Sequence, residues 1–235
     1  MDDVYNEIIS DNISEGIEEL VDFLKDIRTN STKEKWDYIV KSALLAHPIK
    51  AILFEKQITS RCFNKPRGYS GDAVLLDMIY KHKSIKSDNV IDRGGKIDEY
   101  LSNAPASKSV RYRKQYQARL IDETAKIKNK PNILSVACGH LREIEISKAV
   151  KNFEISSFVG IDQDAKSLDV IKKDYPSYNI TLLNNSVKDI LTGKCVLKNF
   201  DLIYAGGLYD YLSDRIATRL TGFFLIYFQK KESFY

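Results

Sequence analysis

The hydrophobic pattern of the chain changes at Pro131, and this change constrains the fold more than any other sequence feature. Beyond it, helical periodicity alternates with four short apolar runs, Asn132–Ala137, Phe158–Ile161, Ile180–Leu183 and Asp201–Ala205. Short buried strands that alternate with helices are typical of βαβ units, whose strands form a parallel sheet. We therefore expect an α/β domain at residues 131–235, with helices at 141–150, at 165–174 and from about Ser213.

Residues 1–130 have the periodicity of helices instead. Ile17, Leu20, Val21, Leu24 and Ile27 recur at spacings of three and four, which places them on one face of a helix. Further helices are predicted at 36–47 after a capping box of Ser31 and Glu34, at 51–61, at 73–81 with Asp72 as N-cap, and at 107–128 with Ser107 as N-cap. The polar residues 83–96 are expected to form a loop. The sequence thus predicts a helical cap at 1–130 before the α/β domain.

The composition of the 235 residues is that of a globular protein, with 43% hydrophobic and 29% charged residues. No apolar run reaches the roughly 20 residues that a membrane-spanning helix needs. The start Met1-Asp2-Asp3 lacks the basic and apolar segments of a signal peptide. Cys62, Cys138 and Cys195 form no CxxC motif, which favours a reducing compartment, and the three histidines are too dispersed to predict a metal site. We expect a cytoplasmic protein with no bound metal.

Charge is distributed unevenly along the chain. Residues 1–30 carry nine acids and two bases, whereas residues 31–130 carry 21 bases and 11 acids. A solvated helix face that balances the acidic first helix explains this surplus. Nucleic-acid binding is the less favoured alternative, because basic and aromatic residues alternate on one predicted helix, namely Arg111, Tyr112, Arg113, Lys114, Tyr116 and Arg119.

Candidate ligand-binding residues follow the predicted strands. In a doubly wound sheet, ligands bind at the carboxyl ends of the strands. Gly139 follows the first strand and would let backbone approach a ligand, while Asp162 ends the second strand, where a carboxylate can accept hydrogen bonds from ribose hydroxyls. These two features favour a nucleoside ligand. Arg142 replaces the third glycine of a dinucleotide fingerprint, and no P-loop motif is present, so NAD, FAD and P-loop nucleotides are disfavoured.

The segments ILSVACGH, FVGIDQD and FDLIYAGGLYDYL together resemble the core of class I S-adenosylmethionine (SAM)-dependent methyltransferases, over residues 132–220. With KPRGYSGDAVLLDMIY, they resemble a bacterial subgroup with an N-terminal helical cap. This subgroup includes proteins similar to 3-hydroxypalmitic acid methyl ester synthase and to SAM-cyclising azetidine-2-carboxylate synthase. The resemblance implies a Rossmann-like fold, with SAM as cofactor and a helical cap over the site.

Carried over by position, the resemblance implies cofactor contacts by Ala137 and Gly139 (methionine part), Asp162 (ribose), Gln163 (adenosine), Ser186 and Val187 (adenine), and Gly206 and Leu208 (sulfonium). In the cap loop 67–72, Arg67 or Tyr69 would reach the cofactor's carboxylate or sulfonium. Tyr69, Tyr204 and Tyr209 are candidates for an aromatic catalytic pocket, because an aromatic ring stabilises a nearby cation. Tyr209 and Asp210 would orient an acceptor. Alternatively, Tyr69 anchors its loop, Asp72 only caps a helix, Tyr209 and Asp210 pack a loop, and Arg142-Glu143 is a salt-bridged helix start.

The sequence departs from this family at two places. Ser135 stands where the family has an acidic residue, and Ala137 replaces the first glycine. The family sheet has seven strands in the order 3-2-1-4-5-7-6, but Phe223–Tyr235 lacks the pattern of the last three. The fourth strand would then be an exposed edge, which invites covering by this segment or by a second copy of the chain.

The preferred function is a SAM-dependent methyltransferase of a small molecule. The first alternative is a cyclase that acts on SAM itself and releases methylthioadenosine, since both reactions use the same nucleoside site. The others are an inactive truncated SAM-binding fragment and an RNA-binding protein.

Overall fold

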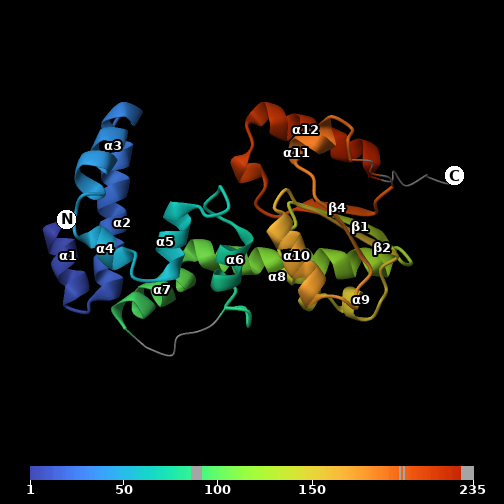
Figure 1. Ribbon diagram of the computed structural model, residues 1–235, viewed down its shortest axis with the longest axis horizontal. Helices are drawn as coiled ribbons and strands as arrows, with labels where there is room; N and C mark the ends of the chain where they lie inside the picture. Colours follow the sequence, from blue (N-terminus) through green and yellow to red (C-terminus); the bar gives the residue numbers. More distant parts are fainter. Residues whose placement is uncertain (86–91, 196, 198, 229–235) are drawn as a thin grey trace. The chain divides into compact units, whose positions relative to one another are not determined.

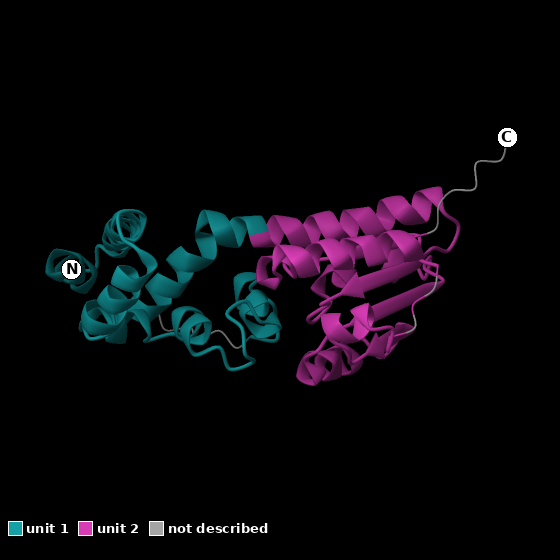
Figure 2. Cartoon of the chain, turned by 90° about the horizontal axis from the view of Figure 1, so that it is seen from above, with its two compact units in different colours: residues 1–109 teal, residues 110–235 magenta. Residues whose placement is uncertain are grey.

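The computed structural model describes residues 1–85, 92–195, 197 and 199–228. The chain forms two compact units, residues 1–109 and residues 110–235, shown in separate colours in Figure 2. Within the described residues, no helix combines the length and the apolar character needed to cross a membrane.

The first unit is helical throughout its described part (Figure 1). Its elements are α1 (Asp2–Ile9), α2 (Ile13–Thr29), α3 (Lys33–Ile39), the π-helical turn η1 (Val40–Leu44), α4 (Ile49–Leu53), α5 (Gln57–Asn64), α6 (Ala73–Ile79) and α7 (Arg93–Asn103). The apolar stripe of α2 packs with α1, α4 and α7 around Ile8, Ile17 and Ile97. This burial of aliphatic side chains explains why the short, polar-rich helices hold together.

Asp72 begins α6 as the sequence predicts. Its Oδ1 accepts hydrogen bonds from the backbone N–H groups of Val74 and Leu75, at 3.1 and 3.0 Å. The Arg61 guanidinium also contacts both carboxylate oxygens of Asp72, each at 2.8 Å. The side chain is fully buried, so the N-cap and the ion pair together satisfy a charge that would otherwise be costly to bury.

The second unit contains a four-stranded sheet in which every pairing is parallel. Its strands are β1 (Asn132–Val136), β2 (Ser157–Ile161), β3 (Ile180–Leu183) and β4 (Leu202–Ala205), in the order β3-β2-β1-β4. β1 is therefore central and contributes Ile133 and Leu134, which are fully buried on opposite faces. The predicted α/β sheet is confirmed.

Helices cover both faces of this sheet (Figure 1). One face packs against α8 (Pro105–Ile127), the 3-10 turn η2 (Arg142–Glu145), α9 (Lys148–Lys151) and α10 (Ala165–Asp174). The other packs against α11 (Val187–Leu191) and α12 (Asp214–Tyr227), and the turn η3 (Tyr209–Tyr211) follows β4. The boundary predicted between 130 and 131 lies between α8 and β1.

Several predicted element boundaries are wrong. Thr32, not Ser31, caps α3 by accepting the Lys35 N–H at 3.2 Å. Helix 51–61 is two helices, α4 and α5, and helix 141–150 is the two short pieces η2 and α9. Residues 93–96 of the predicted loop begin α7, capped by Asp92, while 86–91 lie outside the described residues. Ser107 lies inside α8, where its hydroxyl donates to the Leu101 carbonyl instead of capping the helix.

The segment predicted to cover the fourth strand is described only in part. Residues 223–227 end α12, and Phe228 forms a parallel bridge with Phe200, just before β4. The Phe200 N–H donates to the Tyr227 carbonyl at 3.0 Å. Residues 229–235 lie outside the described residues.

Candidate functional site

The carboxyl ends of three neighbouring strands bring most of the predicted cofactor residues together. Val136 is in register with Ile161 on β2 and with Ala205 on β4. Ala137, Asp162 and Gly206 are therefore the next residues of three adjacent strands. The sequence spacing alone could not show this, because it gives no strand order.

Asp162 ties two of these strand ends together. Its Oδ2 accepts the Gly139 N–H and its Oδ1 accepts the Asp164 N–H, both at 2.8 Å. The side chain is buried, and burial raises the pKa of the carboxyl, while the two backbone N–H donors act in the opposite direction. Each carboxylate oxygen has a second lone-pair direction, so the group can still accept hydrogen bonds from a ligand hydroxyl.

The loop after β1 is held in a backbone conformation that most residues avoid. Ala137, Gly139 and Leu141 have φ values of +52°, +55° and +51°. Left-handed backbone costs a residue other than glycine roughly 1–2 kcal/mol, and such strain clusters at ligand sites. The Cys138 N–H donates to the Ile161 carbonyl at 3.0 Å, and with the Gly139–Asp162 bond it fixes this loop against the end of β2.

The loop after β4 contacts helix α8 of the same unit. A Cβ on Gly206 would lie 2.2 Å from Nε2 of Gln117, and one on Gly207 would lie 3.1 Å from the Arg113 guanidinium. Gly207 also has a φ of +86°. The backbone at Gly207 requires glycine because of its positive φ, whereas a side chain at Gly206 would require the flexible end of Gln117 to move. Gln117 was not predicted from the sequence, and Arg113 was predicted only as an RNA contact.

Tyr204 and Glu143 form a buried pair beneath these two loops. The Tyr204 hydroxyl donates to Oε1 of Glu143 at 2.6 Å. Burial raises the pKa of Glu143, and burial together with the nearby Glu143 carboxylate raises the pKa of Tyr204 well above its usual value. Tyr204 also bonds the Ser135 side chain, and the charge of Lys114 acts on Glu143. Tyr204 was predicted from the sequence, but its partner Glu143 was not.

Replacing Glu143 with glutamine should remove the contribution of this carboxyl group to the pH dependence of the free energy of unfolding. Because the folded state raises this pKa above its ordinary value of 4.5, the folded chain binds the proton more tightly than the unfolded chain. The wild-type free energy of unfolding should therefore fall as pH rises from about 4.5 to the raised pKa. Calorimetry should show that the melting temperature of Glu143→Gln rises relative to that of the wild type as pH increases across this range. Above the raised pKa, the difference between the two melting temperatures should stay constant.

The surface variant Glu154→Gln is the control for loss of a carboxylate that is exposed rather than buried. A wild-type minus Glu143→Gln difference that stays constant with pH would contradict the assignment.

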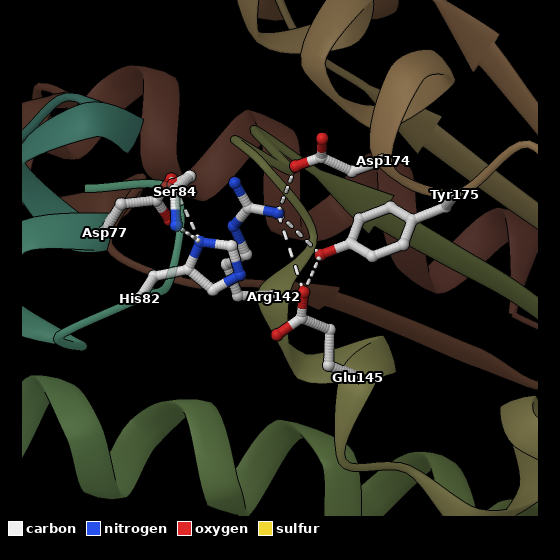
Figure 3. Close-up of polar contacts among 7 residues, drawn as sticks. All are labelled: Asp77, His82, Ser84, Arg142, Glu145, Asp174 and Tyr175. Atoms are coloured by element: carbon white, nitrogen blue, oxygen red, sulfur yellow. Dashed lines mark hydrogen bonds and ion pairs between the residues drawn. The ribbon is translucent and has the colours of Figure 1, made fainter. Parts of the chain in front are cut away.

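Arg142 is the third buried charge near the first loop, and Figure 3 shows its contacts within the second unit. Its Nη1 lies 2.7 Å from Asp174 Oδ2 and 2.8 Å from the Tyr175 hydroxyl, which in turn donates to Glu145 at 2.7 Å. Arg142 begins η2 and pairs with Glu145 at 3.7 Å and with Asp174 at 2.7 Å, which agrees with the expected salt-bridged helix start and holds η2 against the end of α10.

The remaining predicted residues of the second unit occupy the rim of the strand ends. Gln163 is exposed, and Ser186 caps α11 through a capping box with Asp189. Val187 is the first residue of α11, and Leu208 packs with the core below the sheet.

Tyr209 and Asp210 are exposed in η3. The Tyr209 hydroxyl lies 2.8 Å from that of Thr221 on α12. This contact favours the alternative in which Tyr209 packs its loop.

Arg67 and Tyr69 are half-buried on the 65–72 loop of the first unit. That unit also holds a cluster not anticipated from the sequence, in which the Ser84 hydroxyl lies 2.7 Å from Nδ1 of His82 and donates to Asp77 at 3.3 Å (Figure 3). A nucleophilic serine needs histidine between itself and the carboxylate. Here serine is in the middle, so this is not a catalytic triad.

The basic and aromatic residues of α8 do not form one surface. Tyr112 and Tyr116 are exposed, with ring centroids 6.4 Å apart, and the Arg119 guanidinium lies 4.9 Å from the Tyr116 ring centroid. Arg113, by contrast, lies on Gly207. The alternation that suggests RNA binding in the sequence is thus divided between faces of the helix.

The second unit has a parallel sheet with helices on both faces, and glycine-containing loops follow the carboxyl ends of β1 and β4. This arrangement is that of a Rossmann-like α/β protein. The solved structure of a possible exported protein from Bordetella parapertussis shares this fold, with a TM-score of 0.52 and 18% identity over 65% of this chain. At that identity, the likeness shows the fold alone. The chain spans about half (49%) of the length of that protein.

Two methyltransferase structures align less closely. A TehB-like SAM-dependent methyltransferase from Corynebacterium glutamicum has a TM-score of 0.37 and 20% identity, covering 52% of this chain and 66% of its own. The plantazolicin methyltransferase BpumL, in complex with a monoazolic desmethylPZN analog and SAH, has a TM-score of 0.42 and 14% identity, covering 67% of this chain and 54% of its own. These alignments are too loose to carry an argument. No family model and no curated protein match the sequence.

Proposed function

We propose that the second unit binds SAM and that the protein is a SAM-dependent methyltransferase of a small molecule. The observation that carries this proposal is the position of Asp162. Its carboxylate lies at the end of β2 and is bonded to Gly139 of the neighbouring loop, where a nucleoside ribose is held in sheets of this kind. The resemblance of SVACGH, GIDQD and YAGGLYDYL to methyltransferase motifs supports the same ligand.

The residues at the strand ends suit the parts of this cofactor. The turn at Ala137–Gly139 follows β1, and the turn at Gly206–Gly207 follows β4 with the Gln117 and Arg113 side chains packed against it. Asp162 would hold the ribose, and Ser186 and Val187 would border the adenine. When bound, SAM supplies an electrophilic carbon on its sulfonium. The protein then has mainly to position the acceptor and exclude water. Within the second unit, we assign acceptor positioning to Asp210, which is exposed in η3 after β4.

Calorimetry with SAH and mass spectrometry of SAM test this function together. Saturable SAH binding by the wild-type chain is expected. SAM incubated without an acceptor should stay intact, because a methyltransferase needs a second substrate. No detectable binding of SAH would contradict the proposal.

The same incubation examines the cyclase alternative. Cyclisation needs a closed aromatic pocket around the cofactor's own amino group, and Tyr204 is a buried tyrosine at the end of β4. Methylthioadenosine appearing with a four-membered-ring amino acid, above the background without protein, would make cyclisation the function.

Cellular location and assembly belong to the same proposal. Cys62, Cys138 and Cys195 are all free thiols, which agrees with a cytoplasmic protein. A second copy of the chain would cover the outer edge of β4, and light scattering would detect the dimer.

A further inference from the structure

Arg113 lies at the candidate site, and among the residues that the structure describes no acidic side chain bonds its guanidinium. It is half-buried on α8. Its terminal nitrogens and carbon lie 3.1 to 3.5 Å from the position that a Cβ of Gly207 would take. Within the described residues, the structure gives Arg113 no ion pair, whereas Arg119 and Lys128 of the same stretch pair with Glu123 and Asp201.

The place of Arg113 explains what such a charge can bind. The Gly206–Gly207 turn directly follows β4, whose Ala205 is in register with Val136. The turn therefore lies beside the loop that begins at Ala137. Under the proposed function, these two loops border the methionine part of the cofactor, which ends in a carboxylate and an ammonium.

The chemistry of Arg113 and Gln117 indicates which of these two groups, the carboxylate or the ammonium, lies at the turn. A guanidinium is always charged and matches a carboxylate with paired N–H donors. Gln117, one turn further along α8, lies against Gly206 and offers an amide beside the same turn. Because Gly207 has no side chain, the Arg113 guanidinium lies directly against the backbone of this turn.

We propose that Arg113 binds the α-carboxylate of the cofactor's methionine part at the Gly206–Gly207 turn. This inference rests on the proposed function. It gives α8 a cofactor-binding role that the sequence did not indicate.

The experiment compares two ligands and three chains by calorimetry. The ligands are SAH and decarboxylated SAH, which differ only in the carboxylate. In full-length Arg113→Met, SAH affinity should fall about 10- to 100-fold, the range for a lost charge-assisted hydrogen bond. Affinity for decarboxylated SAH should stay within twofold of the wild type. Arg113→Lys should recover part of the lost SAH affinity, because lysine keeps the positive charge but lacks the paired N–H donors of the guanidinium.

Arg119→Met is the matched control, because it removes another arginine of α8 that pairs with Glu123. It should leave both affinities unchanged. Equal losses for the two ligands in Arg113→Met, or no loss, would overturn the role of Arg113 while leaving SAM binding in place. If the wild-type chain binds neither ligand, the proposed function fails, and this inference fails with it.

Discussion

Asp162→Ala should weaken SAH binding by about 1.5–3 kcal/mol, roughly 10- to 150-fold, because it removes charge-assisted hydrogen bonds to the ligand. The structure gives a second reason for a large effect. The same carboxylate accepts the N–H groups of Gly139 and Asp164, so its loss also releases the loop after β1. Calorimetric titration of the wild-type and variant chains measures the difference.

Asp162→Asn tests whether both acceptor oxygens of the carboxylate are needed. An asparagine amide nitrogen would face one of the two backbone donors, so this variant should bind SAH as weakly as the alanine variant. Asp169→Ala, an exposed position on α10 that pairs with Lys172, should change the affinity less than twofold. Unchanged affinity in Asp162→Ala would show that the ribose assignment is wrong.

Arg142→Ala should destabilise the second unit by about 3 kcal/mol, the lower end of the range for breaking a buried ion pair. Its side chain is 2% exposed, whereas those of Asp174 and Glu145 are 28% and 25% exposed. In Arg142→Ala, water can therefore partly solvate the two carboxylates that lose their partner, which limits the loss of stability. Hydrogen exchange of the β1 amides measures the opening free energy of this unit without assuming that both units unfold together.

Arg142→Met tests the source of this stability. Methionine keeps much of the apolar stem but cannot bond Asp174 or Tyr175. If charge pairing dominates, Arg142→Met should resemble Arg142→Ala. Recovery of wild-type protection by methionine would instead show that packing of the stem matters most.

The sequence is most informative where local pattern and burial agree. Helix 165–174 and strand 180–183 have the predicted boundaries, because Asp164 caps the helix and both segments have a single clear periodicity. The prediction fails where tertiary contacts override local preference. Gly94 suggests a loop, yet it lies inside α7, where a side chain would collide with Lys56 and Glu55.

The same distinction applies to the candidate site. Gly139 and Asp162 are visible in the sequence because a glycine turn and an acidic strand end are local signals. Glu143 and Arg113 are not recognisable as site residues, since Glu143 meets Tyr204 across 61 positions and Arg113 reaches Gly207 from a helix that precedes the sheet. A charged pair at 142–143 within an apolar stretch was the only local signal for Glu143.

The left-handed residues Ala137 and Leu141 also bear on the order in which this unit assembles. Neither residue prefers that conformation in an isolated chain, so the loop between β1 and η2 cannot act as a preformed turn that guides folding. Its shape is imposed by β2, through the bonds from Cys138 to Ile161 and from Gly139 to Asp162. We therefore expect the ligand-binding edge to take its shape only once β1 and β2 have paired, and not to be a starting point of folding.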